Sequence, residues 1–419
     1  WRSPRAKVRE ARVSTLLKPF SSEFQVDPYP TYHRLRAEDP VHCASLLGIR
    51  FFVLTRYRDV VAMLKDPRMS AQAAAGGFMP RALADGNLFF KDPPEHTRLR
   101  SLINKAFLPS NIEALRPQVQ AQVDACLDQA LARERAQGHF DVVHDLGVAL
   151  SLGTVLSIMG LPQKDSDRIK HWTEALSVLL DAAQLLPGLP AAHRAAAEII
   201  AYFQDAIAER RRDPRPLIAD ERPRDLLCGL IAARDLADQL TDEELIATAV
   251  FTLMAAHETV TSVIGSGLLA LCSRPAEWAR LCADPTLAAS AFDEMLRFEP
   301  PAQITTKTAR EDLEIDGRLI RKGQVVVAAL AAANRDPEQF PDPDRFDIGR
   351  RDSRHLAFSL GPHYCVGAPL GRMEVRVGLS VLLDRFPELR AAPGSKPTFM
   401  YGVRETVAHG PDSLPALLR

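Results

Sequence analysis

The sequence predicts a mainly α-helical protein with a minor β region. Helix-like patterns of apolar residues cover most of the 419 residues, and the longest one runs from residue 241 to 273. Short β-rich stretches occur between residues 303 and 333 and near residue 51. Since no low-complexity linker or internal repeat marks a border, we expect one domain over residues 1–419, with residues 1–18 as a loosely ordered arm.

Each element follows from local signals along the chain. Turn residues open a short helix at 27–42, and residues 51–64 begin as a strand and continue as a helix. Residues 70–90 contain Gly, Pro and small residues without a period, which predicts a long loop near a ligand entrance. The apolar run 148–161 contains polar residues and a glycine, which favours a buried helix over a membrane span. The remaining helical patterns cover 95–135, 142–160, 165–185, 192–212 and 275–299.

The longest helix-like segment is expected to run through the core. Thr241 and Glu244 form a capping box at its start, and apolar residues cover nearly every face. Its middle reads AAHETVTS, and burying such polar groups is costly unless each finds a partner. Two interpretations stay open: Thr259 bonds back to the carbonyl of Ala255 while Glu258 is a solvated or paired group, or the two side chains relay protons.

Composition excludes several classes of protein. The formal net charge is −1, so nothing favours a nucleic acid or an anionic membrane as a partner. The six cysteines include no CxxC pair, which argues against a zinc site or a disulfide framework and suits a reducing, cytoplasmic setting. Five of them are expected to be small buried side chains. Cys365 differs, because it lies in a tightly built turn, FSLGPHYCVG.

Two groups of charges have spacings that predict contacts. Glu294 and Arg297 lie three apart in EMLR, where they can form a bidentate ion pair, and Arg345 follows in a turn-rich segment. We expect these three to hold the fold together. His96 and Arg100 are four apart near a helix start, where they either grip an anion or form a solvated face.

Taken together, these motifs resemble the cytochrome P450 family. FSLGPHYCVG is similar to its haem-binding signature through Phe358, Gly361, Cys365 and Gly367. AAHETV resembles the oxygen-activating segment of its central helix, EMLR its Glu-x-x-Arg pair, PDPDRFD its later arginine segment and DPPEHTRLR its haem-propionate helix. Along the chain the motifs follow the order of the family, in a match that spans residues 27 to 404, and the resemblance is greatest to the soluble bacterial branch.

The resemblance implies a fold with a long central helix over a haem b and a cysteine loop beneath it. Cys365 would be the iron ligand, held ionised by backbone N–H groups and by the positive end of the following helix. Gly361 would allow a tight turn, and Gly367 would let the backbone approach the sulfur. Where this chain has Lys307 the family often carries arginine, and lysine cannot fork onto a carboxylate. The implied haem contacts are His96, Arg100, Lys307, His363, Phe358, Gly361, Gly367 and Ala255.

The implied activity is that of a monooxygenase, with Glu258 and Thr259 as the proton relay. One atom of dioxygen would enter a C–H or C=C bond of an apolar macrolide or polyketide, steroid, terpenoid or fatty acid. Because the chain has no flavin or iron–sulfur motif, electrons would come from a separate ferredoxin and ferredoxin reductase. We expect a monomer without a membrane anchor. The expected substrate-facing residues are Phe78, Met79, Phe251, Ile304, Phe399 and Met400.

Two other interpretations remain, namely a haem-thiolate sensor or carrier without turnover and a peroxide-driven member of the same fold. The pair Glu258–Thr259 argues against both. Departures from the family pattern affect the same region: Ala256 replaces a frequent glycine and would limit widening of the helix, and Val260 removes one hydroxyl from the relay. Ser359 and Gly371 also depart from the usual residues, glycine and alanine respectively.

Overall fold

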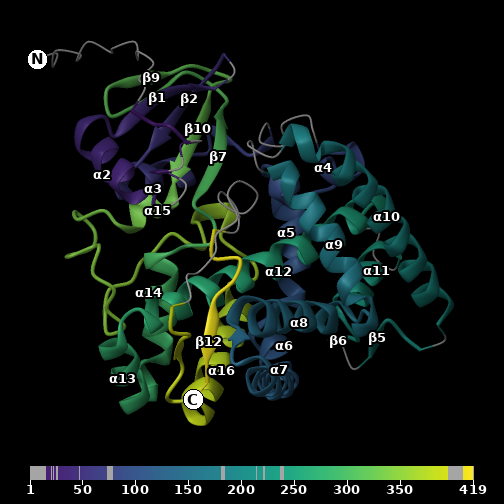
Figure 1. Ribbon diagram of the computed structural model, residues 1–419. Helices are drawn as coiled ribbons and strands as arrows, with labels where there is room; N and C mark the ends of the chain where they lie inside the picture. Colours follow the sequence, from purple (N-terminus) through teal and green to yellow (C-terminus); the bar gives the residue numbers. More distant parts are fainter. Residues whose placement is uncertain are drawn as a thin grey trace, which may run out of the picture.

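In the computed structural model, helices make up most of the molecule and the largest sheet lies at one side of it (Figure 1). Most of the expected N-terminal arm, and the expected pocket residues Phe78, Phe399 and Met400, lie outside the described residues. The structure describes residues 16–19, 21, 23–24, 27–46, 48–72, 79–180, 185–213, 215–219, 222–235, 240–394 and 409–418.

The helices follow the predicted order, with finer divisions. The segment expected as one helix over 142–160 begins as a π-helix, η3 (Val142–Val148), and continues as α8. Short 3-10 turns include η2 (Leu88–Phe90) and η7 (Gly361–His363). The α-helices are α2 (Tyr29–Glu38), α3 (Tyr57–Lys65), α4 (Arg81–Ala84), α5 (Glu95–Ala106), α6 (Pro109–Ala114), α7 (Arg116–Gln137), α8 (Ala149–Met159), α9 (Ser166–Ser177), α10 (Leu185–Arg212), α11 (Leu226–Asp235), α12 (Asp242–Cys272), α13 (Pro275–Ala283), α14 (Ala288–Phe298), α15 (Leu330–Asn334) and α16 (Ala368–Arg385).

The largest sheet joins segments that are far apart in the sequence. Its strand order is β1-β2-β10-β7-β3, and β10 runs parallel to β2 but antiparallel to β7. This register places Lys307 opposite Val326. The strands of this sheet are β1 (Val41–Leu46), β2 (Ile49–Leu54), β3 (Met69–Ser70), β7 (Ile304–Ala309) and β10 (Val325–Ala329). Smaller sheets contain β4 (Phe140–Asp141), β5 (Ile218–Ala219), β6 (Arg222–Pro223), β8 (Leu313–Ile315), β9 (Arg318–Ile320), β11 (Arg390–Ala391) and β12 (Pro415–Leu417).

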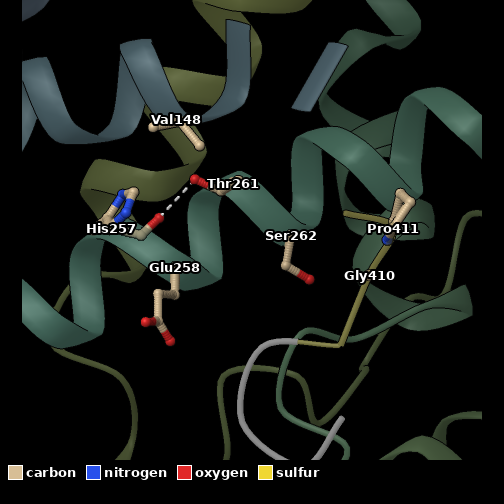
Figure 2. Close-up of a pocket in the computed structure, with 7 residues that line it drawn as sticks. All are labelled: Val148, His257, Glu258, Thr261, Ser262, Gly410 and Pro411. Atoms are coloured by element: carbon tan, nitrogen blue, oxygen red, sulfur yellow. Dashed lines mark hydrogen bonds between the residues drawn. The ribbon is translucent and has the colours of Figure 1, made fainter. Parts of the chain in front are cut away.

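The central helix α12 begins with the predicted capping box, in which Thr241 and Glu244 each bond the other's backbone N–H. Within its polar middle, the Thr261 hydroxyl donates to the His257 carbonyl at 3.0 Å (Figure 2). By length and composition, α12 and the stretch Val142–Met159 could each cross a membrane. Their apolar windows are 61% and 78% buried inside the protein, respectively, as in the core helices of soluble proteins.

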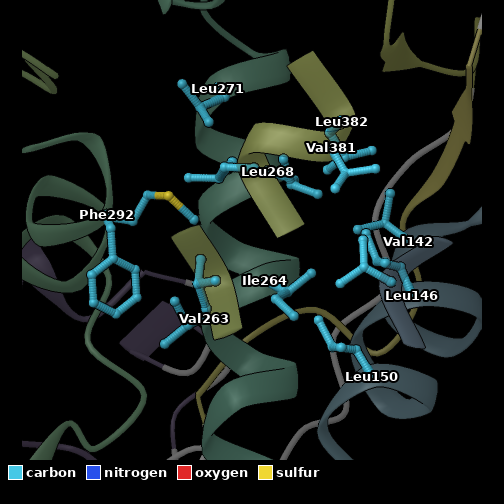
Figure 3. Close-up of a cluster of buried hydrophobic side chains, with 14 of the residues drawn as sticks. Val142, Leu146, Leu150, Val263, Ile264, Leu268, Leu271, Phe292, Val381 and Leu382 are labelled. Atoms are coloured by element: carbon cyan, nitrogen blue, oxygen red, sulfur yellow. The ribbon is translucent and has the colours of Figure 1, made fainter. Parts of the chain in front are cut away.

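The second half of α12 is packed on several sides by apolar residues (Figure 3). Ile264 and Leu268 of α12 belong to one buried cluster with Leu146 of η3, Phe292 of α14 and Leu382 of α16. The first half of α12 belongs to a second cluster with α8 to α11. Since α12 contributes to both clusters, it positions the polar residues at its middle rigidly relative to the rest of the helical part.

Candidate functional site

The loop that presents Cys365 is fixed by its own backbone and by α3. The Cys365 N–H donates to the Phe358 carbonyl at 2.9 Å, which closes the turn. Gly361 has φ +74°, and a Cβ there would lie 2.7 Å from the Leu64 carbonyl oxygen, so this position requires glycine. Ser359, where the family often has glycine, also has a positive φ of +59°. The loop therefore has little freedom to move its sulfur.

Burial raises the pKa of the Cys365 thiol above its ordinary value. The backbone N–H groups of Gly367 and Ala368 and the guanidinium groups of Arg100 and Arg372 act in the opposite direction without outweighing burial. These N–H groups and guanidinium groups do not by themselves lower the pKa of the thiol below its ordinary value, whereas a bound metal ion would deprotonate it outright. A Cβ at Gly367 would lie 3.8 Å from Sγ, an ordinary contact, so the sulfur alone does not require glycine there.

Four basic side chains from three separate segments gather beside this loop. His96 and Arg100 come from α5, Lys307 from β7 and His363 from η7. The rings of His96 and His363 lie 4.2 Å apart, and the Nε2 atom of each is buried without a hydrogen-bond partner among the described residues. Lys307 is only 7% exposed, and within the same part of the chain no carboxylate pairs with its ammonium group.

Burial and the mutual repulsion of the basic groups lower the pKa values of three members of this cluster. Burial, then the neighbouring Lys307 and His96, lowers the pKa of His363 to about 3. Burial lowers the pKa of Lys307 from 10.5 to about 8. Burial, followed by Arg100 and Lys307, also lowers the pKa of His96. Asp92 opposes each of these three shifts, but its carboxylate is already bonded to Arg310 at 2.5 Å. The cluster therefore suits an added dianion.

One face of α12 is open although most of the helix is buried. Ala255 is exposed, and Phe251 and Thr259, one turn to either side, are half-buried. Phe89 of η2 lies 5.4 Å from the Phe251 ring and 6.5 Å from the His363 ring. Phe89 itself is 40% exposed, which is unusual for a large apolar residue so close to the core. Phe89 therefore lies between the open face of α12 and His363 of the cysteine loop.

The two residues expected to relay protons lie on different sides of α12. The Thr259 hydroxyl donates to the Ala255 carbonyl at 2.7 Å, which is the local bond considered from the sequence, and its oxygen can still accept. Glu258 is buried, at 7% exposure, and its side chain extends on the same side as Ser262 (Figure 2). The hydroxyls of Thr261 and Ser262 donate to other groups, the carbonyls of His257 and His409 respectively.

The Glu294–Arg297 pair has the expected bidentate geometry, with N–O distances of 2.7 and 2.8 Å and both side chains fully buried. The prediction for Arg345 was wrong, because its side chain is 66% exposed and reaches only Asp347, at 3.9 Å. Arg350, five residues later, bonds Glu294 instead at 3.2 Å. Only the backbone carbonyl of Arg345 contributes, by accepting from Arg297 and Arg350.

Three residues of the expected substrate pocket lie within the described ranges, and the structure does not place them all in one pocket. Met79 is 8% exposed and packs within the second apolar cluster, while Phe251 faces Phe89. Ile304 is half-buried at the start of β7, three residues before Lys307. Sequence reasoning missed Phe89, which lies just before the DPPEH segment. Its aromatic side chain in a loop was a weak signal, because such residues are usually core.

The residues present fit a haem group. Cys365 is half-buried in a fixed loop, and the basic cluster beside this loop suits the two carboxylates of a haem. This arrangement defines a class, the haem proteins with a cysteine ligand.

Comparisons with known proteins agree with this class. A family model described as Cytochrome P450 matches residues 24–406. The chain is 38% identical over 379 residues to Cytochrome P450 monooxygenase PikC of Streptomyces venezuelae, covering 89% of this chain and 87% of the relative. It is 34% identical over 406 residues to Mycinamicin IV hydroxylase/epoxidase of Micromonospora griseorubida, covering 95% and 98% respectively.

A similar solved structure is that of P450BioI in complex with an acyl carrier protein ligated to hexadec-9Z-enoic acid. It has a TM-score of 0.86 and 30% identity, and the match covers 95% of this chain and all of that chain. The chain belongs to the cytochrome P450 family. It is a cytochrome P450 monooxygenase with a haem cofactor.

Proposed function

We propose that Cys365 is the thiolate ligand of a haem b, and that this chain oxidises an apolar small molecule. The observation that carries the proposal is the cluster of four basic side chains directly beside the cysteine loop, none of which forms an ion pair with a carboxylate among the described residues. Two of its members, His96 and His363, have buried Nε2 atoms that lack a partner within the described ranges. Propionate carboxylates would supply the missing acceptors and charges.

Each basic residue would hold the cofactor in a different way. Arg100 and Lys307 would pair with propionate charge, and the two histidines would donate single hydrogen bonds. Phe358 belongs to the cysteine turn, where its carbonyl accepts from the Cys365 N–H. The guanidinium of Arg372 lies 4.7 Å from the centre of the Phe358 ring. Gly361 allows the tight turn of the loop, and the backbone N–H of Gly367 bonds toward the sulfur. Ala255, on the open face of α12, would contact the haem.

A haem with a cysteine thiolate supplies O–O bond cleavage. The protein must then deliver two protons for each two electrons, so that one oxygen atom enters the substrate and the other leaves as water. Glu258 and Thr259 are the groups of α12 proposed for this delivery, since a carboxylate and a hydroxyl can pass protons through an intervening water. Released hydrogen peroxide would be the product of failed delivery.

The substrate is proposed to be an apolar macrolide or polyketide, steroid, terpenoid or fatty acid that is hydroxylated or epoxidised. The aromatic pair Phe89–Phe251 supports an apolar substrate, because both rings border the open face of α12. The name of one relative describes a hydroxylase and epoxidase of mycinamicin IV, and one structural neighbour binds a fatty-acyl carrier protein. Electrons would come from a separate ferredoxin and reductase in the cytoplasm.

The test begins with the ferrous carbon monoxide spectrum. The wild-type protein is expected to show the strongly red-shifted band of a thiolate ligand, and Cys365→His to lose it while Cys282→Ser, a half-buried cysteine on α13, keeps it. Product formation from NAD(P)H with a surrogate ferredoxin and reductase follows. A red-shifted Cys365→His would overturn the ligand assignment. A correct spectrum without turnover of any candidate substrate class would instead support a sensor or carrier.

A further inference from the structure

A polar stripe runs along the side of α12 that bears Glu258. Glu258, Ser262 and Ser266 follow at intervals of four residues, and each is at most 7% exposed. The chain segment at His409 and Gly410 crosses this stripe, and the Ser262 hydroxyl donates to the His409 carbonyl. A Cβ at Gly410 would lie 3.0 Å from both serine Oγ atoms, so the lack of a side chain permits this close approach.

A small cavity lies where the stripe meets that segment (Figure 2). Its volume is about 10 Å³, which is about the room that one water molecule needs. Cavities of this size with several polar groups in their walls hold water, whereas apolar ones stay dry. The lining residues are Val148, His257, Glu258, Thr261, Ser262, Gly410 and Pro411.

The hydroxyl groups in the wall differ in what they can still offer. Thr261 donates to the His257 carbonyl at 3.0 Å and contacts the Ser151 hydroxyl, also at 3.0 Å, so its oxygen is already engaged. Ser262 uses its single hydrogen on His409, which leaves its oxygen lone pairs as acceptors. A water in the cavity could therefore donate one hydrogen to Ser262 and the other to the Glu258 carboxylate.

We propose that this cavity holds an ordered water that reprotonates Glu258, with Ser262 as the residue that positions the water. The inference rests on the proposed proton-delivering role of Glu258. For each proton that leaves Glu258, the water transfers one proton to the carboxylate and regains one from solvent. The side of the cavity nearest to solvent is expected at His409 and Gly410, because both residues are half-buried while the stripe beneath them is buried.

Ser262→Val, which removes the acceptor and fills the cavity, tests the water site. High-resolution crystal structures of the haem-loaded proteins are expected to show the water in the wild type and not in Ser262→Val. Ser266→Ala is the matched control, because Ser266 belongs to the same stripe and touches Gly410 but does not line the cavity. If Ser262→Val does not fold, Gly410→Ala, whose added methyl group crowds Ser262, provides the second variant.

The functional arm compares product, peroxide and NAD(P)H in one assay. Ser262→Val is expected to lower product per NAD(P)H by about tenfold and to raise the solvent isotope effect, since a positioned proton donor has been lost. Ser262→Thr, which keeps a hydroxyl, is expected to restore coupling. A dry wild-type cavity, or unchanged coupling once the water is lost, would overturn the inference. Absence of turnover in the wild type would refute the proposed function, while the crystal structures would still decide the water site.

Discussion

Lys307 is a residue whose charge depends on what binds beside it. Its pKa is about 8 in the protein without an anion, and a propionate would raise it. A group whose pKa is raised by binding contributes affinity that is complete below its free pKa and is lost as the pH rises through the bound pKa. We therefore expect the contribution of Lys307 to haem affinity to be constant below pH 8 and to fall above it, through proton uptake by Lys307.

Two substitutions test this expectation. Lys307→Met should lose haem about 10- to 100-fold faster, because a hydrogen bond to a charged group contributes about 1.5–3 kcal/mol. Lys307→Arg should retain haem and remove the part of the alkaline pH dependence that Lys307 causes, since arginine stays protonated. Haem transfer to an acceptor globin at several pH values measures both effects. Equal rates for all three proteins would exclude Lys307 from the propionate contacts.

Thr259 tests proton delivery rather than cofactor binding. Thr259→Ala should fold, bind haem and consume NAD(P)H, yet form about tenfold less product per NAD(P)H and more hydrogen peroxide, because the hydroxyl that can hold a water beside the reaction is lost. Thr252→Ala is the control, since Thr252 makes the same type of bond, to the Thr248 carbonyl at 2.8 Å. Unchanged coupling in Thr259→Ala would mean that the hydroxyl serves only its bond to Ala255.

At the scale of elements, the ion pair of α14 depends on a residue outside the helix. Glu294→Ala should destabilise the protein by about 3–5 kcal/mol, since it leaves Arg297 buried without its partner. Arg350→Ala should cost about 1–3 kcal/mol, because Glu294 keeps Arg297 and the Asp347 N–H. Arg345→Ala should change stability by less than about 0.5 kcal/mol. Urea unfolding of the four proteins ranks these effects, and an Arg345→Ala cost equal to that of Arg350→Ala would contradict the assignment.

The same elements show what a sequence can specify. The bounds of α12 were predicted almost to the residue, because the capping box and the apolar pattern are local signals. The π-helix at 142–148 was not predicted, since nothing local distinguishes it from the α-helix that follows. Arg345 and Arg350 lie in one turn-rich segment, and their positions in the sequence do not reveal which of the two side chains is buried against Glu294. Phe89 was missed because its neighbours Phe251 and His363 are distant in the chain.

For the whole molecule, the prediction of one domain can be tested by unfolding. The central helix belongs to both large apolar clusters, and the proposed haem contacts come from α5, β7, α12 and the cysteine loop. We expect far-ultraviolet circular dichroism and the haem absorption band to change at one common midpoint during denaturation. Haem should raise that midpoint, since it binds only the folded chain. Two separated transitions would show that the sheet region and the helical region unfold as independent units.

The contact between Gly361 and α3 has a consequence for how this chain can vary. A side chain at residue 361 would collide with the carbonyl oxygen of Leu64, which is a backbone atom and is the same for every amino acid. In a genetic screen for suppressors of Gly361→Ala, no exchange at residue 64 can therefore remove the obstacle. We expect revertants of this variant to carry glycine at residue 361 again, rather than a compensating substitution at residue 64.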